Sequence, residues 1–387
     1  MKAAQPDAAT PVLEGRRVIF VFGSLELGGA ERQGLTLARH LSEREGAQVE
    51  VWGFNLSGPA ADICDRHGLA RRVIPFYFTG GWRARLTGLA KLAATMRAAR
   101  PDILLPYTHT PNVVCGLIWR LTGARLCVWN QRDAGIERAG DRWERLAVRL
   151  TPQFISNSRP GARFVIDELK ARAAKVEIIR NGVEPLSPEL DRASWRAKLH
   201  ADERCFVACM IGNLHRRKDH ETLLRAWRTV TTVLEAEGRQ ALLALAGSYY
   251  DTHESLVALA VSLGIDERVR FAGHVRDVAG LLGAADVAVF SSRSEGCPNG
   301  VLESMCAGLA VAGTDVEGIR EVVGDAGAPY LAPAGDAHAL ARIILELARD
   351  PALCAMLGAA HRQRVGDEYN STRMCAETVA LLSHHVG

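Results

Sequence analysis

The feature that most constrains this fold is an alternation of short β-branched runs with helical patterns, and it occurs twice along the chain. In the first half, the runs with strand character are Arg17–Phe22, Val49–Gly53, Ile103–Tyr107, Leu126–Trp129, Phe154–Ser156 and Val176–Ile179. Helical patterns lie between them at Glu31–Arg44, Leu86–Arg100 and Asn112–Leu121. Strands that alternate with helices favour a parallel sheet covered by helices on both faces.

The second half repeats this pattern. Its strand candidates are Cys205–Ile211, Ala241–Ala246, Val269–Phe271, Val287–Phe290 and Ala310–Ala312. Its helical patterns are Glu221–Leu234, Glu254–Leu263, Val301–Ala307 and Ala337–Arg349. The stretch Arg180–Pro188 is dense in turn-forming residues, which is typical of a linker.

The chain has 387 residues, which is longer than the chains that usually fold around a single hydrophobic core. We therefore predict an α/β fold with two Rossmann-like, doubly wound parallel-sheet domains that face each other across a cleft. The predicted boundaries are 1–182 and 189–367, with a helix at about 368–387 that packs back on the first domain. Ligands of such sheets bind beyond the carboxyl ends of the strands.

Composition narrows the class of protein. Hydrophobic residues make up 48% of the chain and charged residues 24%, which is typical of soluble globular proteins. The stretch Met1–Thr10 lacks the apolar segment of a signal peptide, and no apolar run is long enough to span a bilayer, so we expect a cytoplasmic protein. The nine cysteines include no Cys-x-x-Cys pair, which favours small buried hydrophobic residues over disulfides or zinc ligands.

Charge is distributed unevenly between the two halves. Residues 1–182 contain 27 Lys and Arg against 17 Asp and Glu, while residues 183–387 contain 20 against 27. An anionic partner of the first half is therefore expected. Trp82–Arg97 is basic and amphipathic, which is compatible with a solvated helix face or with peripheral contact at the inner face of the cell membrane. Nucleic acid is not predicted, because the chain has no recognised reader motif.

Three segments have the residues for ligand binding. The first, Gly23–Gln33, contains Gly28 and Gly29 between the first strand and the first helix. Glycines there let the backbone approach a ligand, and a helix N-terminus favours negative charge. The spacing is not that of a dinucleotide fingerprint, and a plain tight turn is the alternative.

The second segment, Met210–Asp219, follows the first strand of the second half. It carries four consecutive residues, His215–Lys218, that concentrate positive charge. Arg and Lys donate charge-assisted hydrogen bonds to phosphate, so a diphosphate fits there without a metal. A solvated basic loop is the alternative.

The third segment, Ser292–Gly308, places Glu295 before a turn and Glu303 inside the helix that follows. Pro298 suits the start of that helix, so the amides of Asn299, Gly300 and Val301 would lack partners within it. A carboxylate accepts two hydroxyl hydrogen bonds together, as the vicinal diols of a ribose or hexose present them. The segment is therefore suited to a sugar, a phosphate and a ribose.

These segments carry a resemblance to a known family. The chain resembles the retaining glycosyltransferases of family 4, which have the two-domain GT-B fold. The resemblance runs through GGAERQ (Gly28–Gln33), ISNS (Ile155–Ser158), IIRNGVEP (Ile178–Pro185), GNLHRRKDHETLLRAW (Gly212–Trp227) and Val269–Thr314. The last of these contains the E-x7-E pattern of the family as Glu295 and Glu303.

The resemblance implies roles for individual residues. Glu303 would bind the ribose of a nucleotide-sugar, Glu295 the donor sugar, and Lys218 the donor diphosphate. Asn213 occupies the position of the usual arginine, so Arg216 or Arg217 would supply that charge. We expect Glu295, Lys218 and Arg217 to be catalytic. The wider donor-binding set adds Gly28, Gly29, Asn213, Arg216, Asn299, Gly300, Val301, Leu302 and Glu303.

On the acceptor side the resemblance is weaker. The family often has His-Asp after the fifth strand, whereas this chain has Asn130–Asp133, so we take His109 and Arg132 as the acceptor-side candidates. A structural role for His109 is the alternative.

The expected activity follows from these roles. It is the metal-independent, cofactor-free transfer of a hexose-type sugar from a nucleoside-diphosphate sugar to a glycan or polyprenyl-linked acceptor, with retained configuration. The sequence contains no Asp-x-Asp pair to hold a divalent metal. The alternatives are a small-molecule acceptor such as an aminocyclitol, a nucleotide-sugar epimerase, and an inactive scaffold partner of polysaccharide machinery.

Overall fold

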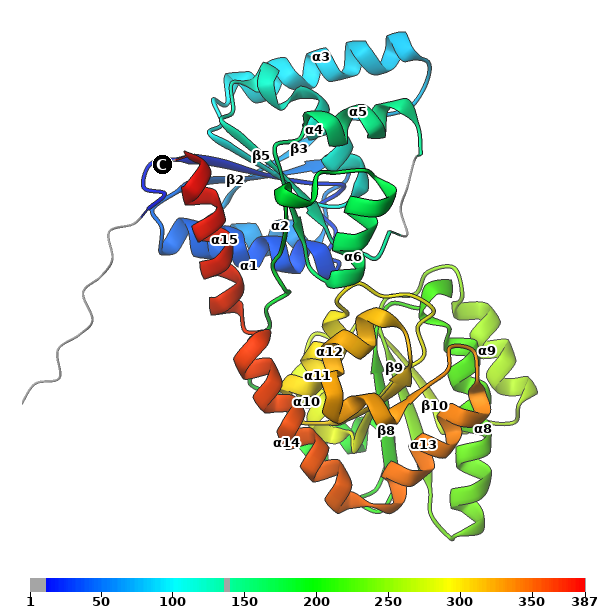
Figure 1. The fold of residues 1–387 in the computed structure, drawn as a ribbon. Helices are drawn as coiled ribbons and strands as arrows, with labels where there is room; N and C mark the ends of the chain where they lie inside the picture. The colour runs from blue at the N-terminus through cyan, green and yellow to red at the C-terminus, as the bar shows by residue number, and fades with distance from the viewer. Residues whose placement is uncertain (1–11, 136–139, 387) are drawn as a thin grey trace, which may run out of the picture. The chain divides into compact units, whose positions relative to one another are not determined.

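The computed structural model describes residues 12–135 and 140–386, which form two compact units (Figure 1). Unit 1 contains the described residues up to Asn157, the segment Gly161–Gly182 and the C-terminal segment from Ser371. Unit 2 contains Ser158–Pro160 and Val183–Asn370. The main boundaries thus fall at 182 and 370, and the linker predicted at 180–188 lies mostly in unit 2.

The described residues of unit 1 form a seven-stranded sheet in the order β3-β2-β1-β4-β5-β6-β7, with every pair parallel. The strands are β1 (Arg17–Phe22), β2 (Gln48–Phe54), β3 (Ala70–Ile74), β4 (Ile103–Pro106), β5 (Leu126–Gln131), β6 (Gln153–Ser156) and β7 (Val176–Ile178). The connecting helices are α1 (Gly29–Glu43), α2 (Pro59–Arg66), α3 (Trp82–Ala98), α4 (His109–Thr122), α5 (Arg142–Leu150) and α6 (Arg159–Arg163). A π-helical turn over Phe164–Glu168 continues α6, and a 3-10 turn over Ala173–Lys175 precedes β7.

Alternate residues of β1 show that this sheet is covered on both faces. Val18, Phe20 and Phe22 pack in one cluster with residues of α1, α2 and the C-terminal helix α15 (Ser371–Val386). Ile19 and Val21 pack in a second cluster with residues of α3 and α4. Successive side chains of a strand point to opposite faces, so a strand buried on both sides reads as a continuous apolar run.

Unit 2 repeats this architecture with a six-stranded parallel sheet in the order β10-β9-β8-β11-β12-β13 among its described residues. The strands are β8 (Phe206–Ile211), β9 (Ala241–Ala246), β10 (Val269–Gly273), β11 (Val287–Phe290), β12 (Ala310–Thr314) and β13 (Leu331–Ala332). The helices are α7 (Arg192–Leu199), α8 (His220–Ala236), α9 (His253–Ser262), α10 (Val278–Ala284), α11 (Asn299–Cys306), α12 (Glu317–Gly327), α13 (Ala337–Arg349) and α14 (Pro351–Glu368). Short 3-10 turns lie at Arg216–Lys218, Asp266–Arg268 and Ala328–Tyr330.

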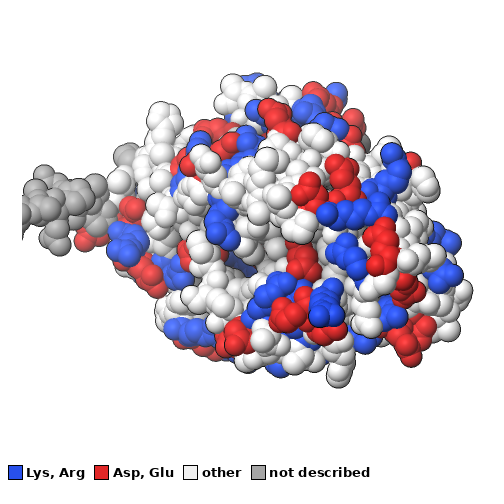
Figure 2. Space-filling model, turned by 90° about the horizontal axis from the view of Figure 1, so that it is seen from below, with Lys and Arg blue, Asp and Glu red and all other residues white. Residues whose placement is uncertain are grey.

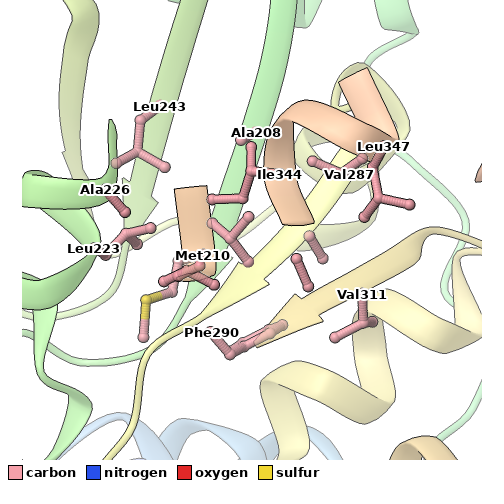
Figure 3. Packing of buried hydrophobic residues seen from close by; sticks show 14 of the residues in the cluster. Ala208, Met210, Leu223, Ala226, Leu243, Val287, Phe290, Val311, Ile344 and Leu347 are labelled. Carbon is pink, nitrogen blue, oxygen red and sulfur yellow. The ribbon is translucent and has the colours of Figure 1, made fainter. Parts of the chain in front are cut away.

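The larger core of unit 2 lies on one face of this sheet. Ala208 and Met210 from β8 point into it, together with residues of α8 and α13 such as Leu223 and Ile344 (Figure 3). Val207 and Cys209 point to the other face, where they pack with residues of α7 and α10. The prediction of two doubly wound, Rossmann-like parallel sheets is therefore confirmed.

Helix α15 is the last element of the chain, yet it packs on unit 1. Met374, Cys375, Val379 and Leu382 are buried in the same cluster as β1 and α1, and α15 lies alongside α1 in Figure 1. The Arg16 guanidinium, just before β1, donates a 2.8 Å hydrogen bond to the carbonyl oxygen of Val386. The C-terminal helix therefore contributes to the core of the N-terminal unit.

Three further properties bear on the remaining sequence expectations. The cysteines are all free, and most are buried, as the sequence predicted. On the face shown in Figure 2, acidic and basic side chains are interspersed rather than gathered by sign. None of the helices in residues 12–135 and 140–386 combines the length and apolar character needed to cross a membrane.

Candidate functional site

The polar loops of unit 2 meet at the carboxyl edge of its sheet. β8 and β11 are neighbours at the point where the strand order reverses: β9 and β10 follow on the side of β8, and β12 and β13 follow on the side of β11. Doubly wound sheets bind ligands at such a point, because the loops after the two strands diverge there. One loop, Gly212–Asp219, follows β8, and the other, Ser291–Pro298, follows β11.

Lys218 and Glu295 form an ion pair between these two loops. Lys218 Nζ donates to Glu295 Oε1 at 2.6 Å, and Ser292 Oγ donates to the same oxygen at 2.6 Å. The Glu295 side chain is 13% exposed and that of Lys218 is 25% exposed. An ammonium group has three donors. Lys218 can therefore keep its contact with Glu295 and still donate to an anion from solvent.

Further hydrogen bonds join the two loops and position Lys218. Ser291 Oγ donates to the carbonyl oxygen of Lys218 at 2.9 Å. The backbone N–H of Arg293 donates to the carbonyl oxygen of Arg217 at 2.9 Å. The Arg293 guanidinium also forms an ion pair with the buried Asp219 carboxylate at 3.1 Å. Asp219 has a left-handed backbone (φ 48°) at the point where the loop turns into α8.

The N-terminus of α11 lies at the same edge. A Cβ atom on Gly300 would be 2.2 Å from the carbonyl oxygen of Ile211, the last residue of β8, so this close approach requires glycine. Pro298 precedes the helix without a side-chain cap, and no acidic residue occupies the first turn. The first amides of a helix have no partner within it and favour anions. Val301 and Leu302 are both buried. The Leu302 N–H already donates to the carbonyl oxygen of Pro298 at 3.2 Å, so the backbone amide of Val301 is the polar group that this pair can offer to a ligand.

Glu303 lies one turn further along α11 and is partly buried. The start of α12 packs on the Glu295 loop, because a Cβ atom on Gly318 would be 2.3 Å from the carbonyl oxygen of Glu295. The glycine in Glu317-Gly318 is therefore needed for packing against the Glu295 loop.

Three predicted donor-binding residues lie around this centre in different environments. Asn213 Oδ1 accepts a 3.0 Å hydrogen bond from the backbone N–H of Ser248, which ties the loop after β8 to the loop after β9. Arg216 is 82% exposed and lies 3.5 Å from the Asp251 carboxylate. Arg217 is also exposed. The structure thus brings Lys218 and Glu295 together, while Arg216 and Arg217 extend into solvent.

His220, the first residue of α8, was not singled out in the sequence. Its side chain is buried, and neither ring nitrogen has a hydrogen-bond partner among the described residues. Burial, and secondarily the charge of nearby Lys218, lowers the pKa of His220 to about 4. The imidazole is therefore neutral at pH 7.

In unit 1, the glycine-rich segment has a different arrangement. Gly28 is the N-cap residue of α1, and its N–H donates to Glu31 Oε2 at 3.1 Å. A carboxylate of the first turn therefore already lies at the N-terminus of this helix. Gly29 is the first residue of the helix. A glutamate three residues after the N-cap is one half of a capping box, and this spacing was readable in the sequence. The other half is absent, because Gly28 has no side chain to accept a hydrogen bond.

His109 begins α4, directly after the carboxyl end of β4. Its Nε2 lies 2.7 Å from Glu144 Oε1, a carboxylate that is 2% exposed and that also accepts from the backbone N–H of Gly140 at 2.7 Å. A buried carboxylate that hydrogen-bonds one ring nitrogen fixes the orientation and tautomer of a histidine. Glu144 is 35 residues further along the chain, and no motif in the sequence marked it.

Arg132 is held inside unit 1. Its guanidinium carbon lies 4.6 Å from the centre of the Tyr107 ring, and its nitrogens donate to the amide oxygens of Asn130 at 3.0 Å and Asn181 at 3.3 Å. Burial raises the pKa of Tyr107, and the charge of Arg132 opposes this shift. Arg132 is therefore locked in place by its neighbours.

The same region joins the sequence segments that carry the family resemblance. The Gln33 side-chain amide exchanges two 2.9 Å hydrogen bonds with the backbone of Gly182. Asn157 Nδ2 donates to the carbonyl oxygen of Arg132 at 3.1 Å. GGAERQ, ISNS and IIRNGVEP are thus packed together, which gives their polar residues a structural role. Within the described ranges, no group of three or more His, Cys, Asp or Glu side chains is placed to hold a metal ion.

Two family descriptions match the chain. Glycosyltransferase family 4 matches residues 27–185, and glycosyl transferases group 1 matches residues 205–350. The first match lies almost entirely in unit 1 and the second lies in unit 2. Together they cover both parallel-sheet units.

Curated relatives have glycosyltransferase activities. The lipopolysaccharide core biosynthesis glycosyltransferase LpsE of Rhizobium meliloti is 28% identical over 341 residues, which cover 84% of this chain and 87% of that protein. The D-inositol 3-phosphate glycosyltransferase of Streptomyces avermitilis is 29% identical over 252 residues, or 61% of this chain. The chain spans about half (54%) of the length of that second relative.

Solved structures show the same fold. The crystal structure of Anabaena Alr3699/HepE in complex with UDP and glucose has a TM-score of 0.82 and 21% identity, and the match covers 95% of this chain and 100% of that one. WaaG, a glycosyltransferase involved in lipopolysaccharide biosynthesis, has a TM-score of 0.71 and 16% identity, with 94% and 99% covered. The chain belongs to glycosyltransferase family 4 and is a glycosyltransferase with the GT-B fold.

Proposed function

We propose that this glycosyltransferase moves a hexose-type sugar from a nucleoside-diphosphate sugar to a glycan or lipid-linked acceptor. The observation that carries the proposal is the Lys218–Glu295 pair at the carboxyl edge of the unit 2 sheet. The start of α11 at that edge, where Pro298 provides no side-chain cap, supports it. Crystal structures of Alr3699/HepE, which shares the fold, were obtained with UDP and with UDP-glucose.

The roles of the residues follow from their charges. The donor diphosphate binds Lys218 and the first amides of α11, both of which favour anions. Glu295 contacts the sugar and Glu303 the ribose hydroxyls, since carboxylates accept paired hydroxyl hydrogen bonds. Arg217 is exposed beside Lys218, and in this proposal it approaches the diphosphate when the donor binds.

Departure of the nucleoside diphosphate develops negative charge on phosphate and cationic character on the sugar carbon. The Lys218 ammonium and the helix amides are fixed before the reaction and stabilise that negative charge, which is the electrostatic effect that usually dominates catalysis. We propose that these groups suffice without a divalent metal, and that the anomeric configuration is retained.

Two substitutions test the site directly. After a thermal-shift screen of nucleotide-sugars has identified the donor, we expect Lys218→Ala and Glu295→Ala each to lower donor turnover by about 100-fold or more. Lys198→Ala is the matched control, because Lys198 lies in the same unit and is exposed beside Trp195. Near-normal turnover in both site variants would show that the site is misassigned.

Metal independence and stereochemistry have separate tests. We expect the initial rate to be the same in excess EDTA and in magnesium, and a rate that requires magnesium would overturn that part of the proposal. The anomeric configuration of the product, read by proton NMR, distinguishes retention from inversion. An epimerase would convert the donor in the absence of any acceptor, and an inactive scaffold would release no nucleotide with any donor and acceptor tested.

For the acceptor, we propose a polyprenyl-diphosphate-linked glycan at the inner membrane surface. The lipopolysaccharide core relatives support a glycan acceptor. Trp82 and Leu86 at the start of α3 are 54% and 45% exposed beside Arg83, and Tyr77 in the loop before the helix is 71% exposed. This apolar and basic combination suits a membrane interface. A small polyhydroxylated acceptor is the second candidate, supported by the D-inositol 3-phosphate glycosyltransferases.

Sedimentation with vesicles tests the membrane part. We expect the protein to bind vesicles containing phosphatidylglycerol at low salt, and the double variant Trp82→Ala/Leu86→Ala to bind less. Leu121→Ala is the control, since Leu121 is equally exposed (60%) at the end of α4. Wild-type protein that stays in the supernatant would favour the small soluble acceptor.

A further inference from the structure

A cavity of about 550 Å³ lies in unit 1, between α5 and the segment Glu168–Lys175 that leads into β7. All of its lining residues belong to unit 1. The Lys218 and Glu295 loops belong to unit 2, so the cavity shares no residue with the proposed donor site. Helix α5 is labelled in Figure 1.

Positive side chains dominate the lining of this cavity. They are Arg145, Arg149, Lys170, Arg172 and Lys175. Two carboxylates, Glu144 and Glu168, accompany them. Five cations around two carboxylates leave an excess of positive charge.

The nearby carboxylate of Glu144 is already engaged. One of its oxygens contacts His109, and the other accepts from the backbone N–H of Gly140. Among the cations, Arg145 donates to the carbonyl oxygen of Gly140 at 3.1 Å, and Lys175 donates to that of Thr151 at 3.3 Å. The side chains of Arg149, Lys170 and Arg172 make no ion pair with any residue in the described ranges.

Like charges around one cavity repel each other, and an anion between them removes that repulsion. Arginine recognises phosphate with paired N–H donors, and lysine recognises it as a point charge. The inner wall is apolar, since Val148, Phe154, Leu169 and Ala171 are buried there. The cavity thus combines a cationic rim with an apolar wall and has room for more than a phosphate ion.

We propose that this cavity binds the phosphate group of a phosphorylated ligand, whose organic part packs against the apolar wall. The inference goes beyond the proposed transfer reaction, since no residue assigned to the donor lies here. A soluble phosphorylated molecule and a phospholipid headgroup share this chemistry, and the experiment below separates them.

The first arm measures pyrophosphate binding by calorimetry at low ionic strength. All proteins carry Lys218→Ala, which weakens binding of the probe at the donor site. In that background, we expect Arg149→Ala/Arg172→Ala to weaken pyrophosphate binding by at least about fivefold. The charge-matched control is Arg44→Ala/Arg66→Ala, because both arginines are exposed in unit 1 and neither lines the cavity.

The second arm measures sedimentation with vesicles of phosphatidylcholine and phosphatidylglycerol, with pure phosphatidylcholine as the blank. A loss of pyrophosphate binding alone assigns the site to soluble phosphorylated ligands. A loss of vesicle binding alone assigns it to a headgroup, and a loss of both supports the shared chemistry.

The proposal is overturned if Arg149→Ala/Arg172→Ala behaves like Arg44→Ala/Arg66→Ala in both arms. Arg149→Lys/Arg172→Lys keeps the charge and should restore at least part of the binding. Equal thermal midpoints of all variants show that the losses do not come from unfolding.

Discussion

The two units have closely related sheets, but different residues lie at the two points where the strand order reverses. In unit 2 the loops after β8 and β11 carry Lys218 and Glu295 in direct contact, and the helix that follows has no acidic residue in its first turn. In unit 1 the helix after β1 is closed by its own Glu31. The loop after β4 leads to His109, which is paired with the buried Glu144.

This difference shows that the architecture fixes where a ligand can bind but not which ligand binds. A carboxylate in the first turn, as at α1, weakens the attraction of a helix N-terminus for an anion. A nearby lysine, as at α11, strengthens that attraction. The unit 2 edge is therefore suited to a diphosphate. The unit 1 edge presents an oriented imidazole, which can hydrogen-bond a neutral hydroxyl group, and an arginine that its neighbours already hold in place.

The largest effect on stability at pH 7 is expected from Gly300→Ala, which breaks the contact that holds α11 against β8. The added methyl would lie 2.2 Å from the carbonyl oxygen of Ile211, so α11 must shift. We expect a loss of about 2 kcal/mol in the free energy of unfolding, and a fall in donor turnover of about tenfold or more. Urea denaturation and donor kinetics measure the two effects.

The matched control is Gly283→Ala on α10, in the same unit. A Cβ atom there meets no atom within 4 Å, so helix propensity should make this variant neutral or slightly more stable. Normal donor turnover in Gly300→Ala would show that the position of α11 does not matter for the donor.

The second prediction concerns the stability of unit 2 in acid, which depends on the buried His220. Its pKa in the folded protein is about 4, below the ordinary value of 6.5, because the ring is buried. The unfolded chain therefore binds more protons between pH 6.5 and pH 4, so this contribution to stability is complete above pH 6.5 and falls as the pH drops. The loss approaches about 3 kcal/mol at pH 4.

Urea midpoints at pH 7 and pH 5, combined with hydrogen exchange of α8 peptides, check this prediction. His220→Leu should lose part of the pH dependence and not all of it, since burial also lowers the pKa of His361 in the same unit. An unchanged difference between pH 7 and pH 5 in His220→Leu would rule out His220 as the cause.

A smaller effect is expected from Glu31→Ala, which opens the start of α1. Loss of the hydrogen bond from the Gly28 N–H to Glu31 should cost about 1 kcal/mol in the stability of unit 1, and donor turnover should stay unchanged. Glu31→Gln keeps an acceptor and should lose less. Glu43→Ala, in the last turn of the same helix, is the control. A drop in donor turnover with Glu31→Ala would mean that the two edges share one function after all.

The smallest effect is expected from Arg216→Ala, the neighbour of Lys218 in sequence. Its side chain is 82% exposed and faces a partly exposed Asp251, and exposed pairs contribute little. We expect donor turnover to change by less than about twofold, against about 100-fold for Lys218→Ala. A tenfold loss would show that this loop rearranges when the donor binds, and donor kinetics measure it.

Much of the fold could be predicted because buried parallel strands have continuous apolar runs. β1 and β9 match their predicted ranges, whereas β3 was missed because its first residues, Ala70–Arg72, are exposed at the sheet edge. Helix α10 was missed because Val278–Ala284 is almost wholly apolar or glycine and has no polar face to give a helical period.

The site could be predicted only in part. Lys218 and Glu295 were each recognisable from local motifs, but their contact joins residues 77 positions apart and depends on β8 and β11 being neighbours. The partner of His109 left no sequence signal, because a buried glutamate on α5 resembles any helical glutamate. The capping role of Glu31 was readable from its spacing to Gly28 and was missed.

The placement of α15 has a consequence for how the protein is made. A ribosome adds residues from the N-terminus, so all of 183–370 is synthesised before the helix that completes the hydrophobic core around β1. Unit 2 can therefore fold on the nascent chain while the earlier unit still exposes the apolar surface that α15 will cover. The core around β1 can therefore close only after the sixteen residues of α15 have been added.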